Sequence, residues 1–313
     1  MEIQFEIEPI SRFDRVYDSN RIFRSLVKAL SIVEGIDRAT EFINIALEDR
    51  EAKISSIIPL INNEVYLPAI RGFIEEPEDE KDDDKKRKIQ KKLKKAAYYK
   101  MKDFQELHKN PKIKTIEDIK EYSYLDENMN LDYFDEEKRG DIKNLVLLSE
   151  HNKVPLFNIG DTEIFYEKDI VFDRRVKFLI LARGKEEFLS RLEKSFEYLQ
   201  NFGLSHSYCV GRGQVRIRKR EENIEIKSGL EGYLVSSLYP TIEEARKIEW
   251  ENSYLNYEIY QAFRWDNKYS YAIPIIKAGS LIKGELPKGQ IIYAGNEEKP
   301  EKRGVYFGRG FYL

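Results

Sequence analysis

The fold of this protein is decided by residues 176–220, which read VKFLILARGKEEFLSRLEKSFEYLQNFGLSHSYCVGRGQVRIRKR. The first seven residues form an apolar run that is typical of a central β-strand. Apolar side chains then recur on one helical face, at Phe188, Leu189, Leu192, Phe196 and Leu199. After a glycine-containing loop, two apolar residues alternate with arginines over residues 215–218, as in a half-buried strand. This order predicts a β-α-β unit.

The N-terminal residues follow the same order. Residues 3–7 alternate apolar and polar side chains, which predicts a strand. An N-cap cluster at residues 18–20 then precedes a helical pattern that ends at Gly35. Residues 42–47 are expected to form the next strand. Two interleaved β-α-β units give a ferredoxin-like sheet with both helices on one face. The sequence therefore predicts an α+β protein whose first domain, residues 1–225, is ferredoxin-like (RRM-like).

A long insertion, about residues 50–170, interrupts this first domain. Within it, residues 54–68 are typical of a strand, a turn at Asn62-Asn63 and a second strand. Residues 75–95 are acidic first and basic second, which favours a solvated loop or exposed helix over a dedicated binding arm. Residues 103–145 are expected to be helical and polar.

The C-terminal part, residues 226–313, is expected to form a second, degenerate ferredoxin-like domain. Its predicted elements are a strand at 233–239, a helix at 241–252 and strands near 254–264 and 271–277. The sequence thus predicts two ferredoxin-like domains with a long insertion in the first.

The composition excludes several classes of protein. An aromatic content of 12% argues against global disorder. The 53 basic and 56 acidic residues nearly cancel, so affinity for nucleic acid requires local clusters of cations. The single cysteine and three histidines exclude an internal disulfide and a typical structural zinc site. No apolar run approaches the ~20 residues of a membrane helix, and the N-terminus is unlike a signal peptide. We therefore expect a cytoplasmic protein with no metal, cofactor or membrane partner.

The loop within residues 201–220 is the clearest candidate site. Its glycines let backbone N–H groups approach phosphate oxygens, its serines add hydroxyl donors, and its arginines supply positive charge. The candidate RNA-binding residues here are Gly203, Ser205, His206, Ser207, Gly211, Arg212, Gly213 and Arg216. The alternative is a helix that ends at Gly203, followed by an ordinary tight turn with solvated basic residues.

Two further basic elements extend this candidate site. Arg21, Arg24 and Lys28 form one stripe on the first helix, just after Arg12. In a ferredoxin-like fold the start of this helix and the loop before the last strand lie within reach of each other. Arg309, between two glycines near the C-terminus, is a third candidate contact. The alternatives are a solvated helix face and a closing strand with a bulge.

Catalytic candidates are few. His206 could assist attack by a ribose 2′-OH as a general base, although a loop histidine that contacts RNA or solvent is the simpler interpretation. Aspartates 82–84 lie in a low-complexity tract that lacks the rigidity of a two-metal site. No Walker loop, H-E-x-x-H or G-x-S-x-G motif occurs. The sequence therefore predicts no catalytic residue.

Taken together, these motifs resemble the RAMP superfamily of CRISPR-associated proteins, and most closely the family of the fourth subunit of the type III-A Csm complex. DSNRIFRSLVKAL (18–30) looks like the family's S-D-T-x-F-x-A-L-x-x-A-L segment. ISSIIPLINNEVYLP (54–68) is similar to its hairpin, and KKLKKAAYYKMKDFQELH (91–108) to its lysine-rich segment. GVYFGRGFYL (304–313) resembles its aromatic–glycine–basic ending, and residues 207–213 fit its glycine-rich loop.

The resemblance implies a non-catalytic subunit that holds the 5′ tag of the guide RNA (crRNA). It also implies two protein partners, the backbone RAMP subunit, whose filament it caps, and the large palm-domain subunit. One alternative is a RAMP endoribonuclease that processes precursor crRNA with His206 as general base. Another is a structural interaction protein whose glycine loop contacts only protein. Cleavage that His206→Ala abolishes would identify the first, and RNA affinity that falls steeply with salt would exclude the second.

Overall fold

The computed structural model describes residues 1–13, 16–74, 83–109, 118–134, 146–153, 165–204, 212–263, 270–294 and 304–313. Its main sheet consists of β1 (Glu2–Pro9), β2 (Lys53–Ile54), β3 (Ile58–Ile61), β4 (Glu64–Pro68), β5 (Ala96–Lys100), β6 (Ser123–Asp126), β7 (Leu131–Tyr133), β10 (Val176–Arg183) and β11 (Val215–Lys219). The strand order is β11-β1-β10-β3-β4-β5-β6-β7, with β2 paired to β10. The mixture of helices and antiparallel strands confirms the α+β class.

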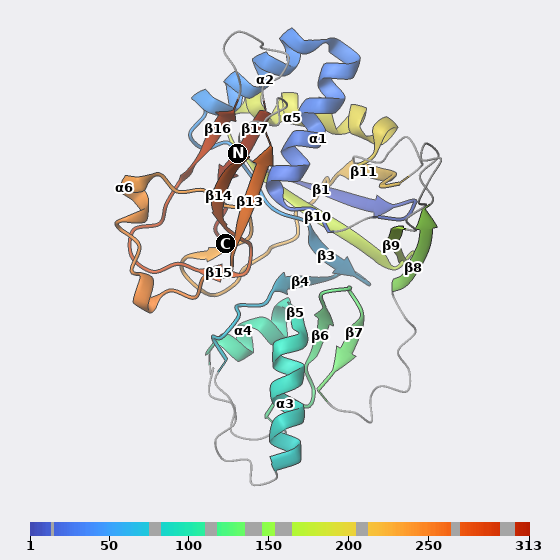
Figure 1. Ribbon diagram of the computed structural model, residues 1–313, viewed down its shortest axis with the longest axis vertical. Coiled ribbons are helices and arrows are strands. Elements are labelled where there is room, and N and C mark those ends of the chain that lie inside the picture. Colours follow the sequence, from blue (N-terminus) through green and yellow to red (C-terminus); the bar gives the residue numbers. More distant parts are fainter. Residues whose placement is uncertain are drawn as a thin grey trace, which may run out of the picture.

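Three helices cover one face of the β11-β1-β10 end of the sheet (Figure 1): α1 (Ser19–Glu34), α2 (Ile36–Glu48) and α5 (Glu186–Phe202). Alternate residues of β10 face opposite cores, so that Phe178 and Ile180 pack beneath the helices while Leu179 and Leu181 pack on the other face. The Asp18 carboxylate caps α1 by accepting from the Arg21 N–H at 2.8 Å. The strand order β11-β1-β10-β3, with α1 and α5 on one face, is compatible with the ferredoxin-like first domain expected from the sequence, and that domain stays a prediction.

The prediction of a strand at residues 42–47 is wrong, because these residues lie in helix α2. The buried residues of α2 are Ala39, Phe42, Ile43 and Ala46, which is the i, i+3, i+4, i+7 spacing of one helical face. The β-branched isoleucines within this stretch suggested a strand, but burial follows the helical period. β2 and β3 take the place of the predicted strand beside β10.

The insertion continues the sheet away from the helices. Asn62 and Asn63 have φ angles of 51° and 64°, as a two-residue hairpin turn between β3 and β4 requires, which confirms the predicted hairpin. The basic part of the charged tract forms α3 (Asp83–Lys95). The prediction of a wholly helical segment at 103–145 is wrong, because α4 (Met101–Lys109) is followed by β6 and β7.

His108 on α4 is buried between two aromatic rings. Its ring centroid lies 3.9 Å from that of Phe104 and 4.8 Å from that of Phe73, and its Nδ1 lies 2.5 Å from the Phe104 carbonyl oxygen. Burial lowers the pKa of His108 to about 4. The imidazole is therefore neutral at pH 7.

This histidine predicts a dependence of stability on pH. Unfolding restores the ordinary pKa of 6.5, so the unfolded chain binds the extra proton first and stability is lost as the pH falls from 6.5 towards 4. We expect wild type to lose up to about 3 kcal/mol more than His108→Phe over this range. Urea unfolding of both proteins at several pH values measures the difference. If the free energies of unfolding of the two proteins change with pH in parallel, His108 contributes nothing to the pH dependence of stability.

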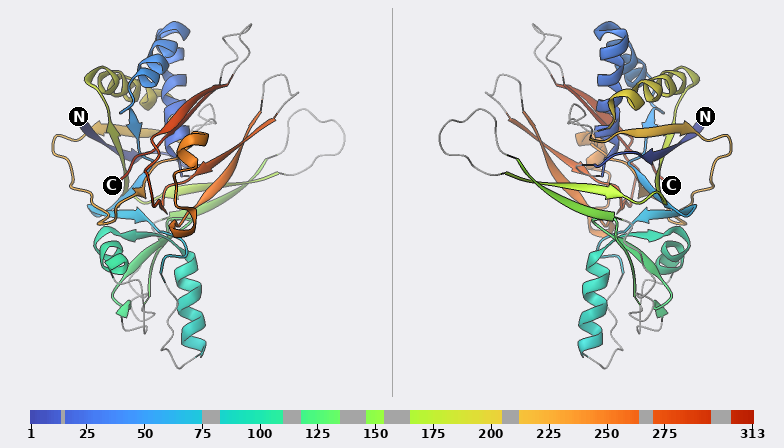
Figure 2. Two further views of the ribbon diagram at one scale, coloured as in Figure 1. Left: turned by 90° about the vertical axis from the view of Figure 1, so that its left-hand side faces the viewer. Right: turned by 90° about the vertical axis from the view of Figure 1, so that its right-hand side faces the viewer.

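The C-terminal part is built from antiparallel strand pairs. These are β12 (Tyr233–Leu234) with β15 (Ser280–Leu281), β13 (Tyr257–Phe263) with β14 (Ser270–Ile276), and β16 (Gly289–Ala294) with β17 (Gly304–Arg309). Figure 2 shows that β13–β14 and β16–β17 extend from the same side of the molecule as the pair β8 (Val146–Lys153) and β9 (Phe165–Phe172).

Two predicted elements of the C-terminal part are shorter than expected, and two are confirmed. The strand expected at 233–239 covers only Tyr233–Leu234. The helix expected at 241–252 stops as the short α6 (Ile242–Ala245), followed by a 3₁₀ turn at Trp250–Asn252. β13 and β14 correspond to the strands expected near 254–264 and 271–277. A second ferredoxin-like domain, with a boundary near residue 225, stays a prediction.

The last strand completes the N-terminal core. The Phe307 ring stacks on Phe23 of α1 at 4.5 Å, and Phe23 in turn stacks on Phe42 of α2 at 5.2 Å. The Phe307 N–H donates to the Asn20 side chain at 3.0 Å. The two ends of the sequence therefore share one hydrophobic core. Among the described helices, none is long and apolar enough to cross a membrane.

Candidate nucleic-acid interface

Two glycines close the base of the glycine-rich loop. Gly203 ends α5 with φ +77° and ψ 169°, and its N–H donates to the Leu199 carbonyl at 2.7 Å. The Leu204 N–H donates to the Gly213 carbonyl at 2.8 Å. A Cβ on Gly203 would lie 2.6 Å from that carbonyl oxygen. Glycine is therefore needed at Gly203 both for its backbone angles and for the close approach.

The base of the loop is joined to the segment that leads into α1. The Gly213 N–H donates to the Arg12 carbonyl at 2.8 Å, and the Gln214 N–H donates to the Ser11 hydroxyl at 2.9 Å. The Ser25 hydroxyl on α1 donates to the Leu204 carbonyl at 3.1 Å. The predicted proximity of the loop and the first helix is therefore confirmed.

A buried carboxylate joins the same two segments to β9. Asp169 is 0% exposed and lies 3.0 Å from Arg212 Nε and 3.3 Å from Arg12 Nε. Phe13 and Ile170 exchange two backbone hydrogen bonds at 2.8 and 2.7 Å, which hold β9 beside the residues before α1. Sequence reasoning missed Asp169, because an isolated aspartate in a strand carries no local signal.

Arg212 is buried at the base of the loop, and its predicted role as a phosphate contact stays a prediction. It is 4% exposed, and its guanidinium faces Asp169. A buried charge is stable only when it is paired. The ion pair between Arg212 and Asp169 therefore fixes the base of the loop against β9. Arg12, with 37% of its side chain exposed, is the more accessible of the two cations.

The basic stripe on α1 lies at the surface. Arg24 and Lys28 are exposed, whereas Arg21 is half-buried and lies 3.8 Å from Asp18. Arg216 on β11 is exposed and pairs with Glu8 of β1 at 3.0 Å. The stripe thus places Arg24 and Lys28 on the helix that also contacts the base of the loop.

Arg309 lies inside the protein, and its predicted role as an RNA contact stays a prediction. Arg309 is 7% exposed, and its guanidinium donates to the carbonyls of Arg50 at 2.9 Å and Leu47 at 3.3 Å. These carbonyls lie at the end of α2, where backbone acceptors lack helical partners. Burial lowers the pKa of Arg309. The residue caps a helix inside the protein.

The middle of the loop lies outside the described residues. Ser205, His206, Ser207 and Gly211 fall there, so their roles stay predictions. Among the described residues, no group of three or more histidine, cysteine, aspartate or glutamate side chains could hold a metal ion.

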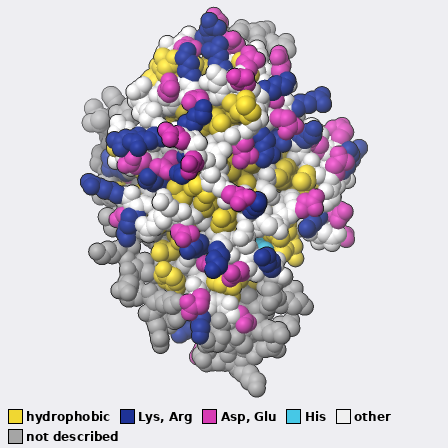
Figure 3. All heavy atoms as spheres, turned by 180° about the vertical axis from the view of Figure 1, so that it is seen from behind, with side chains coloured by type: hydrophobic (Ala, Val, Ile, Leu, Met, Phe, Trp, Pro, Cys, Tyr) yellow, Lys and Arg dark blue, Asp and Glu magenta, His cyan; other side chains and the backbone are white. Residues whose placement is uncertain are grey.

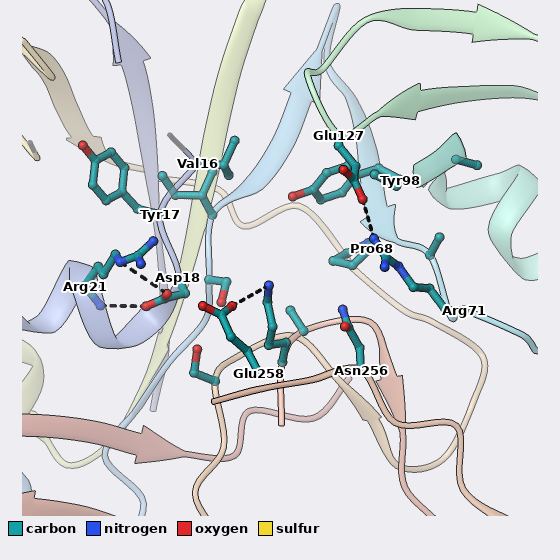
Figure 4. A pocket seen from close by; sticks show the side chains of 18 residues that line it. Val16, Tyr17, Asp18, Arg21, Pro68, Arg71, Tyr98, Glu127, Asn256 and Glu258 are labelled. Atoms are coloured by element: carbon teal, nitrogen blue, oxygen red, sulfur yellow. Dashed lines mark hydrogen bonds and ion pairs between the residues drawn. The ribbon is translucent and has the colours of Figure 1, made fainter. Parts of the chain in front are cut away.

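A cavity of about 340 Å³ opens at the start of α1 (Figure 4). It lies where three parts of the chain meet: the residues leading into α1, the β4–β5 region of the insertion, and the β13–β14 region. Three ion pairs surround it, namely Arg21–Asp18 at 3.8 Å, Arg71–Glu127 at 2.5 Å and Lys277–Glu258 at 2.9 Å. Sequence reasoning had singled out only Arg21 of these residues, because the others come from distant segments.

Figure 3 shows the molecule from behind, relative to the view of Figure 1. On this face, basic and acidic side chains are interspersed with each other. Neighbouring charges of opposite sign weaken the potential felt by a distant polyanion. Over the described residues of that face, the charges therefore lack the single sign of a general nucleic-acid surface, in keeping with a formal net charge of −3.

The comparisons with known proteins identify the fold. No protein-family model and no curated protein matches the sequence. A chain in the crystal structure of the Csm3-Csm4 subcomplex of the type III-A CRISPR-Cas interference complex is 16% identical, with a TM-score of 0.63, covering 99% of this chain and 98% of that one. A chain in the Csm1-Csm4 cassette bound to pppApA is also 16% identical, with a TM-score of 0.60, covering 99% and 96%. Csm4 is common to both structures, so this chain has the fold of Csm4, as the sequence motifs led us to expect.

Proposed function

We propose that this chain is a non-catalytic, RNA-binding subunit of a type III-A CRISPR (Csm) effector complex. In this role it holds the 5′ tag of the crRNA, caps the filament of the backbone RAMP subunit and bridges it to the large palm-domain subunit. The observation that carries the RNA-binding role is the junction of the glycine-loop base, the residues before α1 and Asp169. The proposed partners follow from the shared fold, since the similar chains were solved with Csm3 and with Csm1.

The described residues suggest how RNA would be held. Arg24 and Lys28 lie one and two turns into α1, beside Ser25, which hydrogen-bonds the base of the loop. Cations beside a glycine loop can contact successive phosphates of a nucleic-acid strand. Such contacts position an RNA strand without reading its sequence.

The double substitution Arg24→Ala/Lys28→Ala tests this surface. We expect RNA affinity to fall and the slope of log K against log salt to become shallower by about 1.4, since each lost phosphate contact on a single strand accounts for about 0.7. Titration of crRNA at several salt concentrations, with the partner subunits present, measures both effects.

Arg38→Ala/Lys283→Ala is the matched control, because it removes two exposed cations elsewhere on the surface. Its salt slope should equal that of wild type. Equal slopes for all three proteins would refute the α1 stripe as a phosphate contact. Cleavage of precursor crRNA by wild type, lost in His206→Ala, would refute the non-catalytic assignment.

A further inference from the structure

A second cavity, of about 540 Å³, lies in the insertion and is named the insertion cavity here. It is lined by residues that follow β4 and by parts of α3 and β5. Its volume lies within the range of about 300–1,000 Å³ seen for small-molecule sites. It shares Ala69 and Arg71 with the cavity at the start of α1, but its described lining includes no residue of α1 or of the glycine-loop base. The insertion cavity is therefore separate from the proposed RNA interface.

Apolar side chains form one wall of the insertion cavity. Ile70 belongs to the hydrophobic core of the insertion, and Ile74 and Leu93 pack against that core. Ile89 and Leu93 are the two apolar residues of α3 and lie one turn apart, so this lysine-rich helix directs one face towards the sheet. An apolar wall favours a ligand with an apolar body over a sugar or a free phosphate.

One buried hydroxyl in the lining has no hydrogen-bond partner. Tyr99 is 2% exposed and lines the insertion cavity, yet its hydroxyl hydrogen-bonds no described residue. Its cross-strand neighbour Tyr124 lies outside the lining, and the Tyr124 hydroxyl donates to Asp132 at 2.9 Å. Buried polar groups are almost always hydrogen-bonded, so an exception in a cavity wall indicates a group that meets a ligand. Burial raises the pKa of Tyr99, so the phenol keeps its proton and is available as a donor.

The charges around the insertion cavity indicate the sign of the ligand. Lys94 lines the cavity, is exposed and has no partner among the described residues. Arg71 pairs with Glu127 at 2.5 Å, but 62% and 70% of these two side chains are exposed (Figure 4). Such a surface pair contributes little, so Arg71 can exchange its partner. None of the described lining residues is acidic. Two cations and a hydroxyl donor beside an apolar wall favour an anion.

We propose that the insertion cavity binds a small organic carboxylate with an apolar body. The apolar body lies against Ile70 and Leu93, Lys94 pairs with the carboxylate, and the Tyr99 hydroxyl donates to one of its oxygens. The inference goes beyond the proposed function, because the site does not require that the chain binds RNA.

Calorimetric titration of the full chain tests the class of ligand. The probes are naphthoate, which has a flat aromatic body, octanoate, which has an aliphatic one, and the neutral amide naphthamide. We expect one molar equivalent of at least one acid to bind, and naphthamide to bind at least about tenfold more weakly than naphthoate if naphthoate is that acid. Binding of neither acid would overturn the proposal, as would equal affinities for naphthoate and naphthamide.

Two tyrosine substitutions locate the bound acid. Tyr99→Phe removes a hydroxyl without a partner, so the melting temperature should stay equal or rise while affinity for the acid falls about tenfold. Tyr124→Phe removes a bonded hydroxyl outside the cavity, so the melting temperature should fall while the folded protein keeps its affinity. Thermal unfolding and the same titration measure both quantities.

Two lysine substitutions on α3 test the charge. Lys94→Ala should weaken binding of the acid about fivefold, whereas Lys91→Ala, at an exposed lysine outside the lining, should leave it unchanged. Unchanged affinity in either Tyr99→Phe or Lys94→Ala would show that the acid binds elsewhere and would overturn the proposal. None of these titrations contains RNA, so failure of this site leaves the proposed function untouched, and failure of the proposed function leaves this site untouched.

Discussion

Asp169→Ala is expected to lower the free energy of unfolding by about 3–5 kcal/mol, because it leaves buried positive charge without its partner. Asp169 is 0% exposed and faces both Arg212 and Arg12. The Arg212 side chain is only 5% exposed, so water cannot replace the lost carboxylate. The effect should exceed that of losing a surface pair, which is about 0–1 kcal/mol.

Urea unfolding, monitored by circular dichroism, measures this loss of unfolding free energy. Asp173→Ala is the matched control, because Asp173 lies just after β9 and pairs with Arg175 at 2.7 Å, with 36% and 41% of the two side chains exposed. The double variant Asp169→Leu/Arg212→Met should recover part of the loss by replacing charges with apolar groups. A loss for Asp169→Ala no larger than that for Asp173→Ala would contradict the buried-pair interpretation.

Gly203→Ala is expected to damage both stability and RNA retention. With φ +77° and ψ 169°, Gly203 occupies a backbone region that is essentially restricted to glycine. An alanine in this conformation lowers the free energy of unfolding by about 1–3 kcal/mol. The new Cβ would also lie 2.6 Å from the Gly213 carbonyl oxygen and push the two sides of the loop base apart. We expect RNA affinity to fall at least tenfold in the folded protein.

Gly229→Ala separates these two effects. Gly229 has φ +75°, but the nearest atom to its Cβ would be Gln105 Cγ at 3.9 Å. This variant should therefore lose stability through its backbone while it keeps RNA affinity. If Gly203→Ala binds RNA as wild type does, the closed loop base is not needed for binding.

Local patterns in the sequence predicted the elements with clear periodicity. The β10–α5–β11 unit and the hairpin at Asn62-Asn63 follow from alternation, helical spacing and turn residues. Residues 42–47 show the limit of this reasoning, since β-branched residues suggested a strand where the wider spacing from Ala39 to Ala46 fits a helix. A longer window would have found the helix.

The candidate site was harder to predict, because its decisive contacts join distant residues. Arg309 between two glycines looks like a nucleic-acid contact, and only the fold shows that it caps α2. Asp169 becomes notable only once β9 lies beside Arg12 and Arg212. Ser236 and Ser237 look alike in sequence, yet one is fully bonded and the other is not.

The stacking of Phe307 on Phe23 can form only after the C-terminal strand has been synthesised. Asn20 and Phe307, which are hydrogen-bonded, lie 287 positions apart along the chain. A ribosome adds about 5–20 residues per second, so roughly 15 to 60 seconds pass between the synthesis of these two residues. During that interval part of the apolar face of α1 has no partner strand. The N-terminal half is therefore exposed to chaperones and to misassembly until β17 has been made, and any fragment that lacks β17 keeps that exposure permanently.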